Sequence, residues 1–169
     1  MFAFNLPIPG SDTAKDLAAF DPSQTSTTRM APLGAHAWYN HPTYGMQLYR
    51  QVKASAADVA AYLVAGWSVT SDSESCSVAA ATADKKRGEI AGVPQNAIAN
   101  GSYGWALVRG VGLGTSHDDY TIGLEVRIHT VAGKISIDAE ADTDMEFLGR
   151  AIEAGGALDA NKKVDWFIG

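Results

Sequence analysis

The stretch from residue 87 to residue 110 constrains the fold more than any other part of the chain. Two strand-like runs, Glu89–Val93 and Tyr103–Val108, are rich in the apolar, β-branched and aromatic residues that suit a half-buried pleated surface. Between them stands Asn100-Gly101, a dipeptide that tolerates positive φ and marks a tight turn. The pattern predicts a rigid β-corner at the centre of the fold.

Within the second run, Gly104 directly precedes Trp105. A glycine inside a strand permits a bend or a close approach by another segment, while the neighbouring indole supplies a large packing surface. We therefore expect Trp105 to be a core residue. The stretch contains no nucleophile motif, metal-ligand set or phosphate-binding loop.

Composition favours one mainly β domain. The chain has 169 residues, 46% of them hydrophobic and 17 of them glycine, which suits many short strands and turns better than a helical bundle. The formal net charge is -6, and the pI is near 5.0, so the chain lacks the basic surface of a non-specific nucleic-acid binder. The short basic run at residues 85–87 is flanked by Asp84 and Glu89 and is interpreted as a solvated loop.

Cysteine usage and hydropathy bear on where the chain is made. Cys76 is the one cysteine, so no intramolecular disulfide forms, and we expect a small, partly buried side chain in a protein made in a reducing cytoplasm. No apolar run approaches the length of a membrane span, and the N-terminal residues lack the basic region of a secretion signal. We therefore expect no membrane association.

Periodicity predicts about eight or nine strands and one or two short helices. Besides the two runs above, we expect strands at residues 45–54, 67–70, 76–83, 120–131, 134–139, 146–154 and 164–168. A short helix is expected at residues 12–20 and a short helix or helical turn at residues 56–66, although 145–154 also fits a helix. Residues 110–116 are glycine-rich and are predicted to be a flexible loop. The predicted fold is a compact antiparallel β-barrel or sandwich with an extended N-terminal arm.

Residues 1–43 are predicted to form an arm and an aromatic loop that precede the β-rich domain of residues 44–169. Prolines interrupt residues 1–35, and four alternating apolar residues begin the chain: Phe2, Phe4, Leu6 and Ile8. Alternation places these four on one face of an extended segment, which docks either on its own domain or on a neighbouring subunit. Trp38, Tyr39 and Tyr44 form an aromatic, loop-like cluster that suits an interface or stacking on a sugar or base.

Patterns that suggest chemistry have simpler interpretations here. The run Gly110-x-Gly112-x-Gly114 lacks the spacing and the βαβ setting of a dinucleotide site. Acidic residues alternate through 138–146, but the run lacks the glycine of a Ca²⁺ loop and is expected to be solvated. His117-Asp118 could form a base–carboxylate pair, but the sequence has no Gly-x-Ser-x-Gly nucleophile motif for it to activate. The other histidines, His36, His41 and His129, show no metal-ligand spacing and are interpreted as ordinary surface residues. We expect no catalytic residues, no metal and no cofactor.

Two motifs carry a family resemblance. The central stretch resembles a signature of small β-rich virion proteins of tailed phages, of the head-decoration (cement) kind, through Ala91, Gly92, Val93, Ala97, Ile98, Gly101, Tyr103, Gly104, Trp105, Val108 and Gly110. Residues 148–155, with Gly149 and Arg150, resemble a strand near the end of those proteins. With the ending Val164–Ile168, the resemblance covers about residues 44–169 and leaves 1–43 without a counterpart.

The resemblance implies a non-enzymatic structural protein, made in the host cytoplasm, that binds the outer capsid surface of the virion. Its implied partners are the major capsid protein and sister copies, with a trimer favoured among homo-oligomers. The alternative is a carbohydrate-binding β-sandwich module of a tail or fibre that uses Trp38, Tyr39 and Tyr44. A hydrolase that uses His117 and Asp118 is a more distant alternative.

Overall fold

The computed structural model describes residues 20–55, 57–67, 75–77, 87–117, 119, 121–136, 147–154 and 160–168. Within these ranges the chain is mainly β, as predicted, and its helical content is one 3-10 turn, η1 (Arg87–Glu89). The strands are β1 (His36–His41), β2 (Gly45–Ala54), β3 (Ala65–Trp67), β4 (Ser75–Ser77), β5 (Ile90–Pro94), β6 (Tyr103–Thr115), β7 (Glu125–Ile128), β8 (Ile135–Ser136), β9 (Gly149–Ala151) and β10 (Asn161–Phe167).

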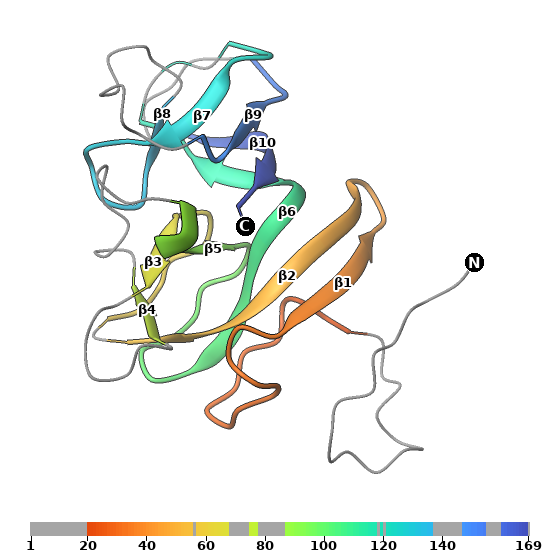
Figure 1. Ribbon diagram of the computed structural model, residues 1–169, viewed down its shortest axis with the longest axis vertical. Helices are drawn as coiled ribbons and strands as arrows, with labels where there is room; N and C mark the ends of the chain where they lie inside the picture. Colours follow the sequence, from red (N-terminus) through yellow and green to blue (C-terminus); the bar gives the residue numbers. More distant parts are fainter. Residues whose placement is uncertain are drawn as a thin grey trace.

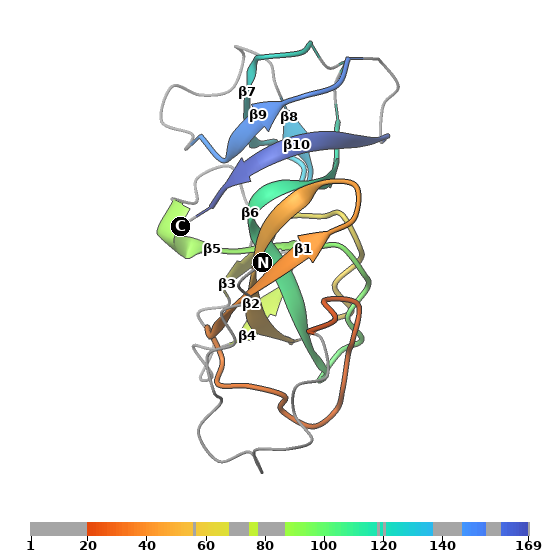
Figure 2. The ribbon, with the colours of Figure 1, turned by 90° about the vertical axis from the view of Figure 1, so that its right-hand side faces the viewer.

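Strand β6 joins the two parts of the molecule. It is the longest described strand, at 13 residues, and it runs from the lower group of strands to the upper one in Figure 1. Its first half pairs antiparallel with β2 and β5, and its second half, from Arg109 to Thr115, pairs antiparallel with β10. β9 and β7 continue from β10, and β8 pairs with β7. The molecule is therefore elongated, with β7, β9 and β10 stacked beyond β1–β6 (Figure 2).

In the lower group, pairing returns to its starting strand. β2 pairs with β4, β4 with β3, β3 with β5, β5 with β6, and β6 again with β2, which gives a barrel-like circuit. The β2–β4 contact is parallel, and the others are antiparallel. Few strands leave little interior space, so small side chains fill it. One buried cluster accordingly contains four alanines among its seven residues: Val52, Ala54, Val59, Ala65, Ala91, Ile98 and Ala106.

The larger core cluster follows β6 into the upper group. It includes Trp105 and Leu107 of β6, Val164 and Trp166 of β10, and Leu148 beside β9. Leu107, Val164, Trp166 and Leu148 have no exposed surface. Burial of apolar surface is the main favourable term in folding, so this continuous core holds the two groups of strands together.

The predicted corner at residues 87–110 is confirmed. β5 and β6 pair through Val93 and Leu107, and the amide of Ser102 donates to the carbonyl of Ala99 (2.9 Å) across Asn100-Gly101. Gly101 has a φ of 78°, which glycine adopts without strain. A Cβ on Gly104 would lie 2.6 Å from the Ile98 side chain, so this glycine permits the close approach that its position predicted.

The prediction of a flexible loop at residues 110–116 is wrong, because Gly110, Gly112 and Gly114 lie within β6. Each glycine meets a close neighbour: a Cβ would lie 2.6 Å from the Met46 carbonyl at Gly110, 3.0 Å from the Gln95 amide oxygen at Gly112, and 2.6 Å from the Trp166 ring at Gly114. The alternating glycines thus make room for packing against the strand.

The helix predicted at residues 56–66 is also wrong. Val59 instead exchanges two backbone hydrogen bonds with Ile98, each 2.8 Å long, and Ala65 begins β3. Tyr62 has a φ of 67°, which no helix accommodates. Its amide donates to Pro94 (2.7 Å), and its carbonyl accepts from Thr115 (2.8 Å). These long-range bonds override the helical tendency of an alanine-rich segment.

Other predicted strands are present but shorter or shifted. β3 starts two residues before the predicted 67–70, β7 occupies four residues of the predicted 120–131, and β9 shows that the segment near residue 150 is a strand. Most of the predicted helix at 12–20, the Cys76 side chain, the run at 84–86, Asp118 and the acidic run 138–146 lie outside the described residues.

Part of the predicted arm packs on the domain. Residues 20–35 place Phe20, Met30 and Ala35 against the core, and the amide of Ala31 donates to the side chain of Gln51. Ser26 exchanges two backbone hydrogen bonds with Tyr103, of 2.7 and 3.0 Å. Phe2, Phe4, Leu6 and Ile8 lie outside the described residues, so the docking of this alternating face stays a prediction.

Candidate functional site

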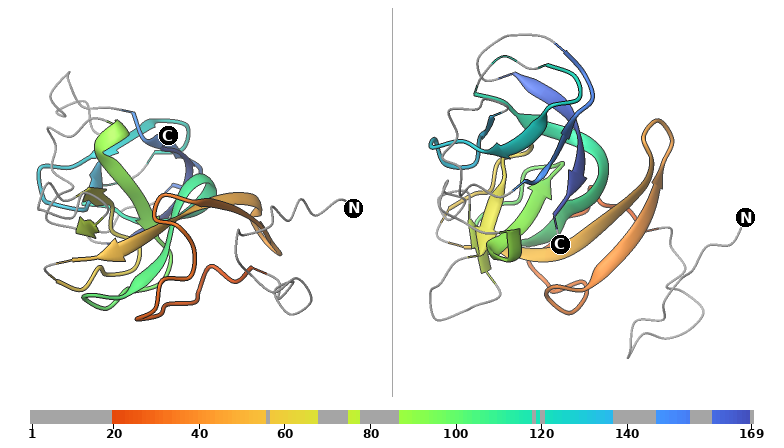
Figure 3. Two further views of the ribbon diagram at one scale, coloured as in Figure 1. Left: turned by 60° about the horizontal axis from the view of Figure 1, so that its bottom comes forward. Right: turned by 45° about the horizontal axis from the view of Figure 1, so that its top comes forward.

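The β1–β2 hairpin carries the residues that the sequence singled out. Trp38 and Tyr39 lie in β1, and Tyr44 lies in the turn before β2, so the segment predicted to be loop-like is a hairpin. Its tip stands away from the other strands (Figure 3). Successive residues of a strand point to opposite faces, so Trp38 and Tyr39 face in opposite directions.

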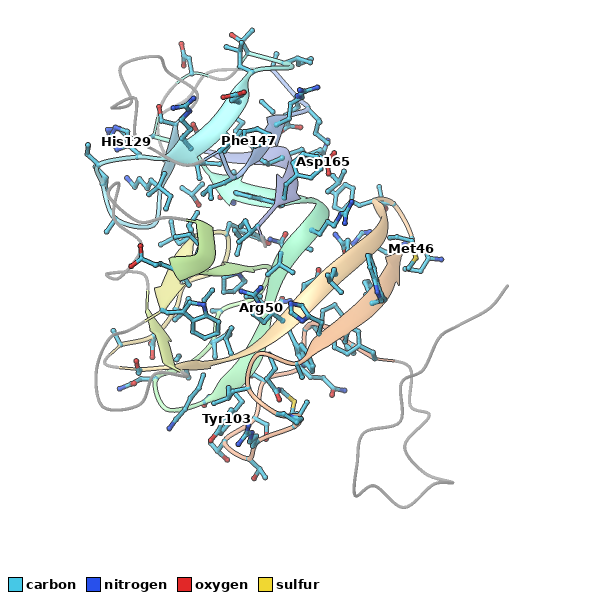
Figure 4. The ribbon with its side chains drawn as sticks, in the orientation of Figure 1. Met46, Arg50, Tyr103, His129, Phe147 and Asp165 are labelled. Atoms are coloured by element: carbon cyan, nitrogen blue, oxygen red, sulfur yellow. The ribbon has the colours of Figure 1, made fainter. Side chains whose placement is uncertain are left out.

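One hairpin face is exposed. Trp38 pairs with Leu48 and Asn40 pairs with Met46, which places Trp38 and Met46 on the same side of the ribbon. Trp38 is 50% exposed and Met46 is 57% exposed. Met46 lies near the tip, and Arg50 lies further along the same strand (Figure 4). We call Trp38, Met46, Arg50 and His36 the outer hairpin face. Leu48 lies on the same side of the ribbon but is half-buried and packs against the core.

Arg50 supplies a cation to this face. Its Nε donates to Nε2 of His36 (3.1 Å), and its Nη1 donates to the carbonyl of Ile90 (3.3 Å). The guanidinium carbon lies 5.9 Å from the centre of the Trp67 ring, a cation–π distance. Burial lowers the pKa of Arg50, and burial together with the charge of Arg50 lowers the pKa of His36. A neutral His36 therefore accepts the Arg50 hydrogen bond.

The other face packs inward. Phe20 meets Trp105 edge to face at 4.7 Å, and it also contacts the rings of Tyr39 (6.2 Å) and Tyr49 (6.0 Å). Tyr49 is buried, its hydroxyl donates to Oε1 of Gln47 (3.0 Å), and burial and the nearby Tyr39 raise its pKa. Two rings of this cluster, Tyr39 and Tyr49, line a cavity.

The cavity has a volume of about 250 Å³. Its lining brings together four tyrosines from separate segments, along with polar and apolar neighbours: Asp21, Pro22, Ser23, Tyr39, His41, Tyr44, Tyr49, Tyr62, Gln95, Asn96 and Leu113. His41 stacks on Tyr44 at 4.5 Å and an interplanar angle of 17°. Of the sequence-predicted cluster, Tyr39 and Tyr44 therefore share this site and Trp38 does not.

A second set of exposed apolar residues lies beside β7 and β9, in the upper group of strands (Figure 1). Ile122 is 60% exposed and Leu124 is 46% exposed, in the turn before β7. The amide of Ala151 donates to the carbonyl of Leu124 (3.0 Å), which brings the exposed Ile152 beside this turn. We call Ile122, Leu124 and Ile152 the distal apolar patch.

The described residues show no arrangement of His117 with a carboxylate that would support the hydrolase hypothesis. The rings of His117 and His129 lie 4.0 Å apart, and Nδ1 of His129 accepts a hydrogen bond from the amide of Val131 (2.9 Å). Asp118 lies outside the described residues. The described part of the chain holds no group of three or more metal-ligating side chains. It also contains no helix long and apolar enough to cross a bilayer.

The residues that carry the family resemblance serve the fold. A Cβ on Gly92 would lie 2.8 Å from Cβ of Ala106, and a Cβ on Gly149 would lie 2.5 Å from the Asp165 carbonyl. Trp105 is 8% exposed, Tyr103 lies 5.8 Å from the ammonium of Lys53, and Arg150 is exposed on β9. Most of the residues that carry the resemblance therefore allow close packing within the sheet, and they do not form a binding site.

The sequence missed several cavity residues. Asp21, Tyr62, Gln95 and Asn96 come from segments up to about 75 residues apart along the chain, and they meet because β5, β6 and the hairpin pair. No local spacing connects them. The one usable signal was aromatic content, which pointed to Tyr39 and Tyr44 but not to Tyr62.

No protein-family model matches the chain, and no curated protein sequence matches it significantly.

Proposed function

We propose that this chain is a non-enzymatic structural protein of a phage virion, which binds the outer capsid surface as a head-decoration protein. The observation that carries the proposal is the outer hairpin face, where Trp38 and Met46 are half exposed on a ribbon that projects from a β-rich domain. Large exposed apolar side chains beside an arginine are typical of protein interfaces. The motif resemblance supports the same assignment.

The capsid lattice suits such a surface. A lattice repeats one binding site many times, so a decoration protein that is itself oligomeric gains avidity from modest contacts. The outer hairpin face would contact the major capsid protein, and the distal apolar patch would contact sister copies, with a trimer as the favoured state. β1 ends the described sheet, so its outer edge has no described partner strand and is suited to strand addition.

Quantitative mass spectrometry of purified particles tests the proposal. A copy number of the order of the capsid-protein count is expected for head decoration. Absence from the particles would refute the proposal, and a copy number typical of a tail or fibre would favour the carbohydrate-binding alternative. The position of the gene beside a capsid or scaffold gene is an independent check.

A matched pair of variants locates the contact. Replacing Trp38 and Met46 with serine is expected to lower particle occupancy strongly, since two exposed apolar contacts are lost. Replacing Ile122 and Leu124 with serine removes a similar exposed apolar surface in the upper group of strands. The second variant is expected to change the mass measured by light scattering while leaving monomer stability unchanged. Equal occupancy for the first variant and the unmodified chain would exclude the hairpin as the capsid contact.

A further inference from the structure

The cavity beside the inner hairpin face has the features of a small-ligand site. Its volume of about 250 Å³ lies just below the range of about 300–1,000 Å³ that is common for drug-sized ligands. A single ring with its substituents fits this space, which is open to solvent on the side of Asp21 and Asn96. The lining residues come from five separate parts of the chain, which the fold brings together.

Aromatic rings form part of the wall. His41 and Tyr44 are stacked at 4.5 Å, and Tyr39 meets the edge of His41 at 6.0 Å and the edge of Tyr49 at 6.4 Å. Tyr and His rings combine an apolar face with a polar tip. The apolar ring faces can pack against the C–H groups of a ligand, while the polar tips can hydrogen-bond to its hydroxyl groups.

Several polar groups of the lining remain available. Among the described residues, no hydrogen bond partner is found for the hydroxyls of Tyr39, Tyr44 and Tyr62 or for the side-chain amide of Asn96. Nδ1 of His41 accepts from the amides of Thr43 (3.1 Å) and Tyr44 (3.2 Å), so the neutral ring carries its proton on Nε2 and retains a donor there.

Other lining groups are already committed, which fixes the shape of the wall. Nε2 of Gln95 donates to the carbonyls of Val93 (3.2 Å) and Leu113 (3.0 Å), and its Oε1 accepts from the amide of Leu113 (2.9 Å). Asp21 accepts from the amide of Ser23 (2.8 Å), and hydrogen bonds from Ser23 lower the pKa of this carboxyl. Asp21 is therefore an ionised acceptor at the cavity.

Tyr62 is held in an uncommon conformation. Its φ of 67° lies in the left-handed region, which costs a non-glycine residue energy, and backbone hydrogen bonds to Pro94 and from Thr115 hold it there. Strained residues of this kind are concentrated at ligand-binding sites. Here the strain occurs at a residue that lines the cavity and whose hydroxyl has no described partner.

We propose that this cavity binds the ring of a neutral pyranose sugar. Stacked aromatic rings match the C–H face of the sugar, while tyrosine hydroxyls, an amide, an imidazole N–H and a carboxylate match its hydroxyl groups. Among the described lining residues, none is a lysine or an arginine and one is a carboxylate, which disfavours phosphorylated or acidic ligands. The site lies on the hairpin face opposite Trp38 and is independent of the proposed capsid contact.

Ligand-observed NMR on the full chain tests the proposal. The probes are the methyl glycosides of glucose, galactose, mannose and N-acetylglucosamine, with adenosine and glucuronic acid as comparisons. Saturation transfer to at least one neutral glycoside at millimolar concentration is expected, with weak or no transfer to glucuronic acid. Transfer to adenosine alone would assign the cavity to a planar base and overturn the proposal, as would the absence of transfer to every glycoside.

Variants then connect binding to the cavity. Tyr44→Ala removes a stacked ring and Asn96→Ala removes an exposed amide, and each is expected to weaken binding, the former by about tenfold or more, equivalent to about 1.4 kcal/mol. Tyr62→Gly removes a third group while relaxing the backbone strain. Trp38→Ala is the control, since Trp38 lies on the opposite face of the hairpin. Binding that survives all three cavity variants, or that is lost in Trp38→Ala, would place the site elsewhere.

Discussion

Replacing Trp105 with alanine is expected to be among the most damaging single substitutions in this chain. The indole is 8% exposed and meets Phe20 at 4.7 Å, in the cluster where β2 and β6 pair. Removing a large buried aromatic side chain costs about 3–5 kcal/mol, through lost burial and the cavity left behind. For a chain of this length, that loss lowers the melting temperature by about 6–20 °C.

Chemical denaturation at equilibrium measures this effect, with Trp38→Ala as the matched control. Trp38 is 50% exposed, so its truncation is expected to change the free energy of unfolding by less than about 1 kcal/mol. A double-mutant cycle with Phe20→Ala should show a coupling of about 0.5–1.5 kcal/mol, as expected for an edge-to-face pair. A loss below about 1 kcal/mol for Trp105→Ala would mean that the ring does not support the core.

Three further predictions follow from individual contacts. Gly92→Ala is expected to destabilise the fold by at least about 1–3 kcal/mol in denaturant titration, since Gly92 has a φ of 138° and a Cβ there would meet Ala106 and the Leu107 carbonyl. Because the pKa of folded His36 lies below its ordinary value of 6.5, the unfolded state binds more protons just below that pH. Stability should therefore fall as pH drops through about 6.5, and His36→Gln should flatten this dependence in urea titrations at pH 7 and pH 5. Deleting residues 1–10 should leave the melting temperature unchanged and lower particle occupancy, whereas unfolding of the truncated chain would show that the segment belongs to the core.

Local sequence signals predicted the parts of the fold that depend on local physics. The Asn100-Gly101 turn, the strand at Tyr103 and the burial of Trp105 all follow from turn chemistry and side-chain type. The close approach of the Ile98 side chain to Gly104 was likewise predictable, since a glycine inside a strand often marks a site where another segment approaches closely.

The errors share one cause, which is that distant partners decided the outcome. Gly110–Thr115 looked flexible because glycine has no side chain to pack, yet the segment pairs with β10. The space that its glycines leave is occupied by the Met46 carbonyl, the Gln95 side chain and the Trp166 ring. Residues 56–66 looked helical because alanine favours helices, yet Val59 pairs with Ile98 across about 40 residues of sequence. Neither partner is visible within a window of local sequence.

The candidate site was predictable only in part for the same reason. Tyr39 and Tyr44 stood out as aromatic residues close together in sequence, but assigning them to a loop concealed the alternation of β1. A strand separates neighbours onto opposite faces, so Trp38 belongs to a different surface from Tyr39. Once the strand is recognised, one aromatic cluster becomes two candidate surfaces.

This separation makes the two proposed interactions experimentally distinguishable on one hairpin. Trp38 and Met46 are exposed on the outer face, whereas Tyr39, His41 and Tyr44 line the cavity on the other. A substitution on one face removes contacts that the other face does not make. Changes to the outer face should therefore lower capsid occupancy without changing sugar affinity, and changes to the cavity should do the reverse. If Trp38→Ala weakened sugar binding as much as Tyr44→Ala, the sugar would not bind in the cavity, because Trp38 does not line it. That outcome would refute the assignment of the two interactions to opposite faces of the hairpin.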